Sequence, residues 1–211
     1  NGYEVTIIDS SQLALENSQS NLQSILNRLI EKGKIDENEA KSIIANINWT
    51  SEMEDISSSK LAIEAIVENM EIKQKLFYQL ESLVSDDCIL ATNTSSLSVA
   101  GITSACNNPS RILGIHFFNP VPLMKLVEVI PTEKTDGELF KKVKSILENW
   151  GKTVVTAKDT PGFIVNRVAR PFYGEALRIY EEGIADFATI DWAMKEFGGF
   201  RMGPFTLMDY I

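Results

Sequence analysis

The sequence predicts an α/β fold, with a mostly parallel sheet flanked by helices, followed by the start of an all-helical domain. Through residue 159, short strands rich in β-branched residues alternate with helical patterns of ten or more residues. This alternation is typical of a parallel sheet covered by helices on both faces. Beyond residue 160 only helical patterns remain. We therefore expect an α/β domain at residues 1–159 and a helical domain at residues 160–211.

Apolar runs bounded by turn residues predict the strands. The first run, from Tyr3 to Asp9, is β-branched and ends in an aspartate. Another run, from Cys88 to Thr92, ends in a polar turn. The expected strands lie at residues 3–9, 60–67, 88–92, 112–118, 126–130 and 153–157.

Apolar residues spaced three and four apart predict the helices of the α/β domain. One such pattern runs from Leu22 to Ile30 and is closed by Gly33. Asp36 and Glu39 then form a capping-box-like start to a second helix. Further helices are expected at residues 71–84 and 136–149.

Three helices are expected in the second domain. Thr160 is suited to cap the first, with Pro161 at its first helical position, and the pattern continues through Tyr180. Thr189 is expected to start the next helix, and Pro204 the last.

Composition excludes several classes of protein. The 211 residues are 44% hydrophobic, enough for a large core, and the net charge is −9. Such an acidic chain disfavours binding to nucleic acid or to an anionic membrane. The two cysteines, Cys88 and Cys106, form neither a disulfide framework nor a zinc site, which indicates a reducing compartment and no metal. No apolar run approaches the roughly 18 residues of a membrane span.

The only histidine in the chain, His116, lies at the end of one expected strand, and Glu128 lies within the next. An imidazole titrates near neutral pH, so His116 is the first candidate for proton transfer. A carboxylate beside it would fix its tautomer and favour the imidazolium. Alternatively, His116 is a satisfied core histidine and Glu128 faces solvent. Burying both side chains is costly unless they pair.

Polar residues also follow several other expected strands, at the sheet edge where doubly wound folds bind ligands. Asp9 either caps the next helix or accepts hydrogen bonds from an adenosine ribose, and its charge would favour NAD over NADP. Glu68 and Lys73 open a helix, and Asn93 and Ser95 form a turn. Each is open to a purely structural interpretation, but their recurrence at one edge favours a site.

Several motifs resemble those of the 3-hydroxyacyl-CoA dehydrogenases, most closely the short-chain, 3-hydroxybutyryl-CoA type. The similarity spans essentially the whole chain, with the motifs in a consistent order. The strings H-F-F-N-P and K-D-T-P-G-F-I-x-N-R are not generic α/β features. The motifs are Val67–Asn69, Asn93–Leu97, His116–Pro122, Met124–Ile130, Lys158–Arg167 and Met202–Phe205.

This resemblance implies a Rossmann-like domain and the NAD-dependent oxidation of an (S)-3-hydroxyacyl-CoA to the 3-oxoacyl-CoA. It implies that His116 takes the proton of the 3-hydroxyl group and that Glu128 orients His116. The other implied roles are substrate binding by Ser95, Asn119 and Asn166, ribose binding by Asp9, and a cofactor cleft lined by Glu68, Lys73 and Asn93.

Coenzyme A is polyanionic, so an acidic protein needs a local basic patch to bind it. Arg28, Lys32 and Lys34 could supply that patch, or they could simply form a solvated helix end. By resemblance, Lys32 matches the lysine that faces coenzyme A. Ile25 stands where some relatives carry a serine for the same ligand.

The resemblance also implies features that this sequence lacks. A first strand with its G-x-G-x-x-G loop would lie before residue 1, and the helical domain, which supplies the homodimer interface in relatives, would continue beyond Ile211. We therefore expect a fragment with an opened sheet, little affinity for NAD and no activity when isolated. In the full-length protein we expect a homodimer, in a bacterial cytoplasm or a mitochondrial matrix.

Two alternatives remain at this stage. One is a non-catalytic relative with the same fold, such as some lens crystallins, against which the retained His116, Glu128, Ser95 and Asn166 argue. The other is a dehydrogenase of β-hydroxyacids or sugar acids. Those enzymes use a lysine in place of the His/Glu pair, and their motifs do not match this sequence.

Overall fold

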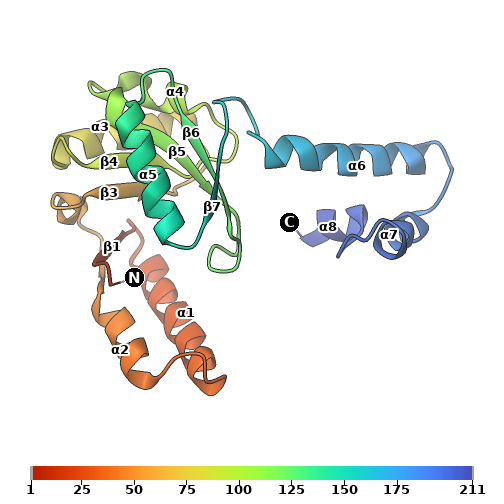
Figure 1. Cartoon of the computed structure of the whole chain (residues 1–211), viewed down its shortest axis with the longest axis horizontal. Helices are drawn as coiled ribbons and strands as arrows, with labels where there is room; N and C mark the ends of the chain where they lie inside the picture. The colour runs from red at the N-terminus through yellow and green to blue at the C-terminus, as the bar shows by residue number, and fades with distance from the viewer. Residues whose placement is uncertain (1, 211) are drawn as a thin grey trace.

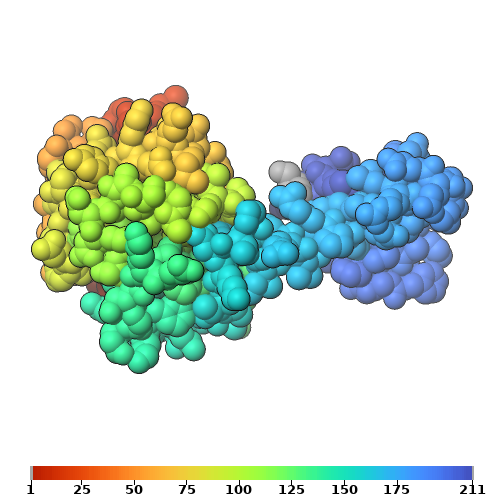
Figure 2. Space-filling model, turned by 90° about the horizontal axis from the view of Figure 1, so that it is seen from above, coloured from red at the N-terminus to blue at the C-terminus, as the bar shows by residue number. Residues whose placement is uncertain are grey.

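The computed structural model describes residues 2–210 and consists of an α/β body and a helical segment (Figure 1). The expected bounds at residues 1 and 211 lie outside the described residues. The α/β body contains all the strands, and the helical segment projects from it as a separate lobe in the space-filling view (Figure 2). Within residues 2–210, no helix is both long enough and apolar enough to cross a bilayer.

The strands form two groups that are hydrogen-bonded internally. In the smaller group, β1 (Val5–Ile8) lies parallel to β2 (Ile47–Thr50). The larger group has the order β3-β4-β5-β6-β7, and all its pairs are parallel except β5 with β6. Its strands are β3 (Leu61–Glu64), β4 (Ile89–Thr92), β5 (Ile112–Phe117), β6 (Leu126–Pro131) and β7 (Thr153–Thr156). The predicted α/β class with a mostly parallel sheet is confirmed.

Helices in the α/β body begin where the sequence supplies caps. Ser11 caps α1, and Asp36 forms the predicted capping box with Glu39 at the start of α2. Asn69 and Asp136 cap α3 and α5 through their side-chain oxygens. The helices are α1 (Gln12–Glu31), α2 (Glu37–Ala45), α3 (Met70–Leu83), α4 (Val99–Ile102) and α5 (Gly137–Asn149), with 3₁₀ turns at Met53–Ile56, Thr103–Ala105 and Pro109–Arg111.

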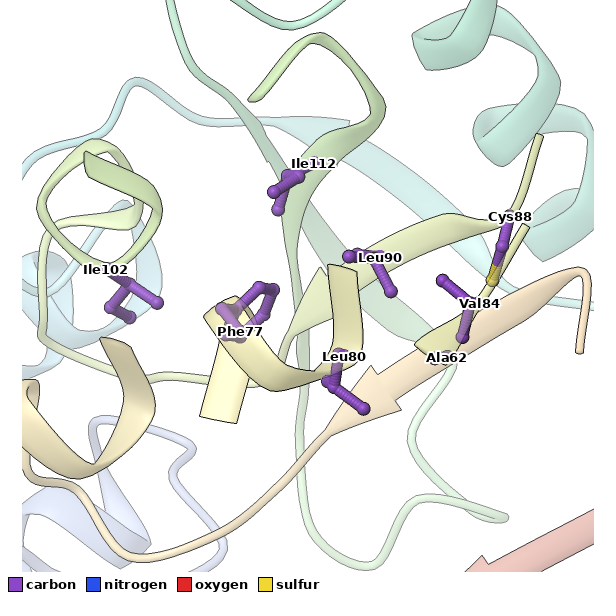
Figure 3. Close-up of a cluster of buried hydrophobic side chains, with 8 residues drawn as sticks. All are labelled: Ala62, Phe77, Leu80, Val84, Cys88, Leu90, Ile102 and Ile112. Atoms are coloured by element: carbon purple, nitrogen blue, oxygen red, sulfur yellow. The ribbon is translucent and has the colours of Figure 1, made fainter. Parts of the chain in front are cut away.

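Alternating side chains of the central strands divide the core between the two faces of the sheet. Leu90 points to the face covered by α3, where Phe77 and Leu80 pack against it (Figure 3). Its neighbours Ile89 and Ala91 point to the opposite face, which α5 covers. Burying each large apolar side chain contributes about 1.5–3 kcal/mol. The two clusters therefore fix β4 and β5 between two helical layers.

The helical segment consists of α6 (Val165–Glu181), α7 (Phe187–Glu196) and α8 (Pro204–Tyr210). Aromatic rings join its helices: Phe187 stacks on Tyr180 at 3.9 Å between ring centroids and lies 4.4 Å from Phe205. Asp191 of α7 accepts hydrogen bonds from the first turn of α8. These contacts make α6, α7 and α8 one packed unit.

Two predicted helix starts in the helical segment are wrong, and in the α/β body α1 begins at Gln12, ten residues before the predicted Leu22, because Ser11 caps it there. The first helix of this segment begins at Val165 and not at Pro161, because Gly162 and Phe163 adopt positive φ angles of 77° and 45° that interrupt a right-handed helix. The next helix begins at Phe187, two residues before Thr189, because Asp186 is its cap and accepts a hydrogen bond from the Thr189 amide.

The sequence analysis also missed β2, Ile47–Thr50, because a run of only four residues is too short to identify a strand even though its apolar and polar side chains alternate. Partial burial against α1 and pairing with β1 define this strand instead. Such tertiary contacts are not visible in a short stretch of sequence.

Gly114 in the middle of β5 offers a test of this packing. An added Cβ would lie 3.0 Å from both Ile130 Cβ and Val99 Cγ2. We expect Gly114→Ala to lower the free energy of unfolding by about 1–3 kcal/mol through overpacking. Denaturant titration measures the change. Gly137→Ala is the matched control, because nothing lies within 4 Å of its added Cβ. Equal stabilities of the two variants would contradict the described packing.

Candidate active site

The antiparallel pair β5 and β6 places the histidine opposite the glutamate. In their register His116 faces Glu128, so both side chains leave the same face of the sheet. His116 Nδ1 lies 2.7 Å from Glu128 Oε2. The exposed fractions are 6% for His116 and 0% for Glu128. The two side chains therefore form a buried pair, the arrangement that the sequence analysis kept open beside a core histidine with a solvent-facing Glu128.

The second oxygen of Glu128 is bound by the start of the helical segment. Glu128 Oε1 accepts hydrogen bonds from the backbone N–H groups of Ile164 and Val165, each at 2.9 Å. Ile164 is the N-cap residue of α6 and makes no capping hydrogen bond of its own. The carboxylate of β6 therefore caps α6 from another element. Three donors offset the cost of burying this carboxylate.

The opposite side of the imidazole remains available. An ionised carboxylate only accepts hydrogen bonds, so contact with Glu128 requires the proton of a neutral His116 on Nδ1. Among residues 2–210, none hydrogen-bonds Nε2, and this atom is not among the buried unpaired nitrogens. Phe118 and Phe163 pack against the ring, with centroids 4.6 and 5.6 Å away. In a neutral ring bound this way, Nε2 is the nitrogen without a proton and can act as the proton acceptor.

Glu68 organises the loop after β4 that carries Ser95. Its Oε1 accepts hydrogen bonds from Thr94 Oγ1 at 2.5 Å, from the backbone N–H groups of Ser95 and Ser96 at 3.0 and 3.1 Å, and from Ser96 Oγ at 3.0 Å. One carboxylate in the loop between β3 and α3 thereby fixes the backbone after β4. The contacts of the Glu68 carboxylate in this structure are with side chains and backbone groups of the same chain.

A buried lysine forms an ion pair with Glu68. Lys73 of α3 is 1% exposed, and its Nζ lies 2.5 Å from Glu64 Oε1 and 3.4 Å from Glu68 Oε2. Glu64 Oε2 also accepts a hydrogen bond from Thr92. In this structure Lys73 therefore acts on the site through Glu68. The sequence analysis missed Glu64, although a glutamate in an otherwise apolar strand, nine residues before a lysine, was the available signal.

Asn93 and Asn166 join the loop after β4 to the histidine strand and to the helical segment. Asn93 Oδ1 accepts a hydrogen bond from the backbone N–H of Phe117, the residue after His116. Asn166 of α6 donates from Nδ2 to the Ser95 carbonyl oxygen at 3.4 Å. Four of the predicted site residues, His116, Asn93, Ser95 and Asn166, are thus linked across β4, β5 and α6.

Other predicted residues lie farther from this group. Asp9, at the end of β1, is exposed and accepts a hydrogen bond from the Ser11 amide. Asn119 lies exposed in the connection after β5. Lys32 is the exposed C-cap residue of α1, whose C-terminal end points away from the five-stranded sheet (Figure 1). No hydrogen bond or ion pair within the described chain joins Lys32 to the histidine pair.

The residues fit a dinucleotide better than a metal. Asp9, Glu68 and Asn93 follow the parallel strands β1, β3 and β4, at the edge where doubly wound folds bind nucleotides. One oxygen of the exposed Asp9 carboxylate makes no hydrogen bond to the described residues. By contrast, no group of three or more His, Cys, Asp or Glu side chains in residues 2–210 is arranged to hold a metal ion.

The pKa of Glu68 gives a pH-dependent test. Burial opposes its ionisation, but hydrogen bonds from Thr94, Ser95 and Ser96 and the charge of Lys73 outweigh burial and lower the pKa from 4.5 to about 2. Because the folded-state pKa is lowered, the stabilisation is fully present above about pH 4.5 and is lost as the pH falls toward 2.

We therefore expect Glu68→Gln to lower the thermal unfolding temperature near neutral pH, with a difference from the wild type that shrinks below about pH 4.5. Thermal unfolding followed by circular dichroism over a pH series measures it. Glu133→Gln, at an exposed position after β6, serves as the control. A difference that grows on acidification would contradict the assigned contacts.

Comparison with known proteins gives consistent matches along both parts of the chain. The family model for the 3-hydroxyacyl-CoA dehydrogenase, NAD binding domain, matches residues 1–160, and that for the C-terminal domain matches residues 162–211. The chain is 40% identical to human mitochondrial hydroxyacyl-coenzyme A dehydrogenase, over 100% of this chain and 69% of the human protein. It is also 40% identical to a 3-hydroxybutyryl-CoA dehydrogenase of Clostridioides difficile, over 100% of this chain and 75% of that protein.

Solved structures agree with these matches. The crystal structure of the (S)-3-hydroxybutyryl-CoA dehydrogenase from Ralstonia eutropha superposes with a TM-score of 0.94 at 35% identity, covering 98% of this chain and 73% of that one. The 3-hydroxybutyryl-CoA dehydrogenase from Escherichia coli gives a TM-score of 0.95 at 38% identity, covering 98% of this chain and 44% of that one.

Proposed function

Because this chain belongs to the 3-hydroxyacyl-CoA dehydrogenase family, we propose that it oxidises (S)-3-hydroxyacyl-CoA to 3-oxoacyl-CoA with NAD⁺ and a His/Glu pair. We further propose short-chain substrates such as 3-hydroxybutyryl-CoA, after the names of the relatives in C. difficile and R. eutropha. The contact between His116 Nδ1 and Glu128 Oε2 is the observation that carries the proposal.

His116 acts as the general base of the oxidation. Its unprotonated Nε2 removes the proton from the 3-hydroxyl group while electron density moves from oxygen toward C3. NAD⁺, when bound, supplies the acceptor for the hydride that leaves C3. In the reverse direction the same imidazolium returns the proton to the 3-oxo group. One side chain therefore serves as base and as acid.

Glu128 makes this proton transfer easier in two ways. Its anionic carboxylate stabilises the imidazolium that forms at His116. It also fixes the ring orientation, so that Nε2 always faces the substrate. The two N–H donors at the start of α6 bind the other oxygen of Glu128 and fix the position of its carboxylate. The helical segment thereby takes part in the chemistry through Glu128.

Polar groups around the histidine orient the substrate and the cofactor. Ser95 and Asn166 hold the oxygens of the acyl group, and Asn119 shapes the entrance beside the histidine. Asp9 binds the adenosine ribose, and Asn93 and Glu68 line the cofactor cleft, with Lys73 supporting Glu68. The anchoring of the Ser95 backbone to Glu68 supports this division of roles.

The remaining roles concern coenzyme A and assembly. Lys32, with Arg28 and Lys34, binds the phosphates of coenzyme A, since an overall charge of −9 demands a local basic patch. The helical domain at residues 160–211 forms a homodimer interface. Its many exposed apolar side chains, including Val168, Ile184 and Phe197, support that assignment.

Substitution of the acid/base pair tests the proposal. In the full-length protein, we expect His116→Gln to lower kcat for acetoacetyl-CoA reduction by at least about a hundredfold, because the substitution removes the group that accepts and returns the proton. Glu128→Gln should lower kcat as well, because it removes the negative charge beside the imidazolium and can disturb the tautomer of His116. NADH absorbance follows the reaction.

Glu133→Gln provides the matched control, since the same substitution is made five residues along at an exposed position. Its kcat should equal that of the wild type. Near-normal turnover by His116→Gln would defeat the proposed function.

A further inference from the structure

The turn that leads into α6 has an unusual backbone. Gly162 and Phe163 are consecutive residues with positive φ angles, 77° and 45°. Glycine adopts this region readily, but a bulky residue there is a conformational outlier. Phe163 is the one non-glycine residue of this kind within residues 2–210. Strained residues of this type cluster at functional sites, where the surrounding structure holds them.

This turn contacts both members of the His116–Glu128 pair. The N–H groups of the next two residues, Ile164 and Val165, point at the same Glu128 oxygen. The Phe163 side chain lies against His116, with ring centroids 5.6 Å apart and planes 57° apart. The backbone therefore holds the carboxylate while the side chain holds the imidazole that the carboxylate binds.

Two aromatic rings contact the imidazole. Phe118, the second residue after His116, contributes the other ring, with a centroid distance of 4.6 Å. Phe163 itself is 3% exposed and packs with Val99, Ile130 and Ala157. These buried neighbours fix the Phe163 ring. The fixed ring in turn restricts rotation of the imidazole about its bond to the backbone.

We propose that Phe163 is a positioning residue for the proton transfer, which aligns His116 through its ring and Glu128 through the left-handed turn that it completes. The inference rests on the proposed function of the His116–Glu128 pair. Phe163 touches neither reacting atom, so its role is to keep Nε2 of His116 in the productive direction. The alternative is that Phe163 only packs in the core. In that case its substitution should leave the proton-transfer step unchanged.

Phe163→Leu tests this role, because leucine keeps apolar bulk but lacks the flat ring. Phe163→Met provides a second variant should the leucine variant fail to fold, since methionine adapts to irregular cavities. Val99→Ala is the matched control, because it removes buried apolar volume from the same cluster but leaves the Phe163 ring in place. Each variant is made in the full-length protein, purified and assayed for acetoacetyl-CoA reduction in H₂O and in D₂O, and its thermal stability is measured.

We expect the Phe163 variants to lose about tenfold or more in kcat, with KM for acetoacetyl-CoA changed by less than about twofold. Their solvent isotope effect on kcat should rise, because a misaligned imidazole makes proton transfer more rate-limiting. Val99→Ala should lose thermal stability and keep the kcat and isotope effect of the wild type. Phe163 variants that behave like Val99→Ala would overturn the positioning role.

The two proposals fail in distinguishable ways. If His116→Gln turns over as fast as the wild type, the proposed function is wrong, whatever Phe163 does. If turnover depends on His116 while the Phe163 variants match Val99→Ala, only the positioning role is wrong.

Discussion

The structure depends on one buried carboxylate, that of Glu128. It lies in β6, faces His116 across the antiparallel pair, and accepts hydrogen bonds from the first two backbone amides of the helical segment. A buried carboxylate is costly without donors, and these three contacts offset that cost. Consequently the same interaction orients the proposed base, caps α6 and joins the helical segment to the sheet.

A second carboxylate, Glu68, fixes the loop after β4 as Glu128 fixes the histidine. It gathers the backbone amides and hydroxyl groups of residues 94–96, and a buried lysine, Lys73, supports it. Both acids use backbone N–H groups that belong to neighbouring elements. Acidic side chains therefore hold the candidate site together by binding backbone N–H groups of the same chain. These hydrogen bonds fix the positions of the loop after β4 and of the first residues of α6.

The sequence predicted much of this arrangement, because strands and helices leave periodic patterns. The strands carrying His116 and Glu128 were readable, and burial made their pairing favourable. Other features depend on tertiary contacts: β2 forms because β1 and α1 cover it, and Glu64 pairs with a lysine on another element. The turn at Phe163 could not be predicted from residue propensities, because Thr160-Pro161 is a good helix start. The positive φ angles of Gly162 and Phe163 delay the start of α6, and the amides after them bind Glu128.

The tautomer of His116 is the most direct measure of the central claim, and it is accessible because the chain contains a single histidine. Nitrogen-15 NMR of the labelled imidazole, recorded on protein without a histidine tag, distinguishes protonated from unprotonated ring nitrogens. Above the pH at which the ring becomes neutral, the spectrum should show the proton on Nδ1 and none on Nε2. A neutral ring protonated on Nε2, or an even mixture of the two tautomers, would contradict the assignment of Glu128 as the group that orients the base.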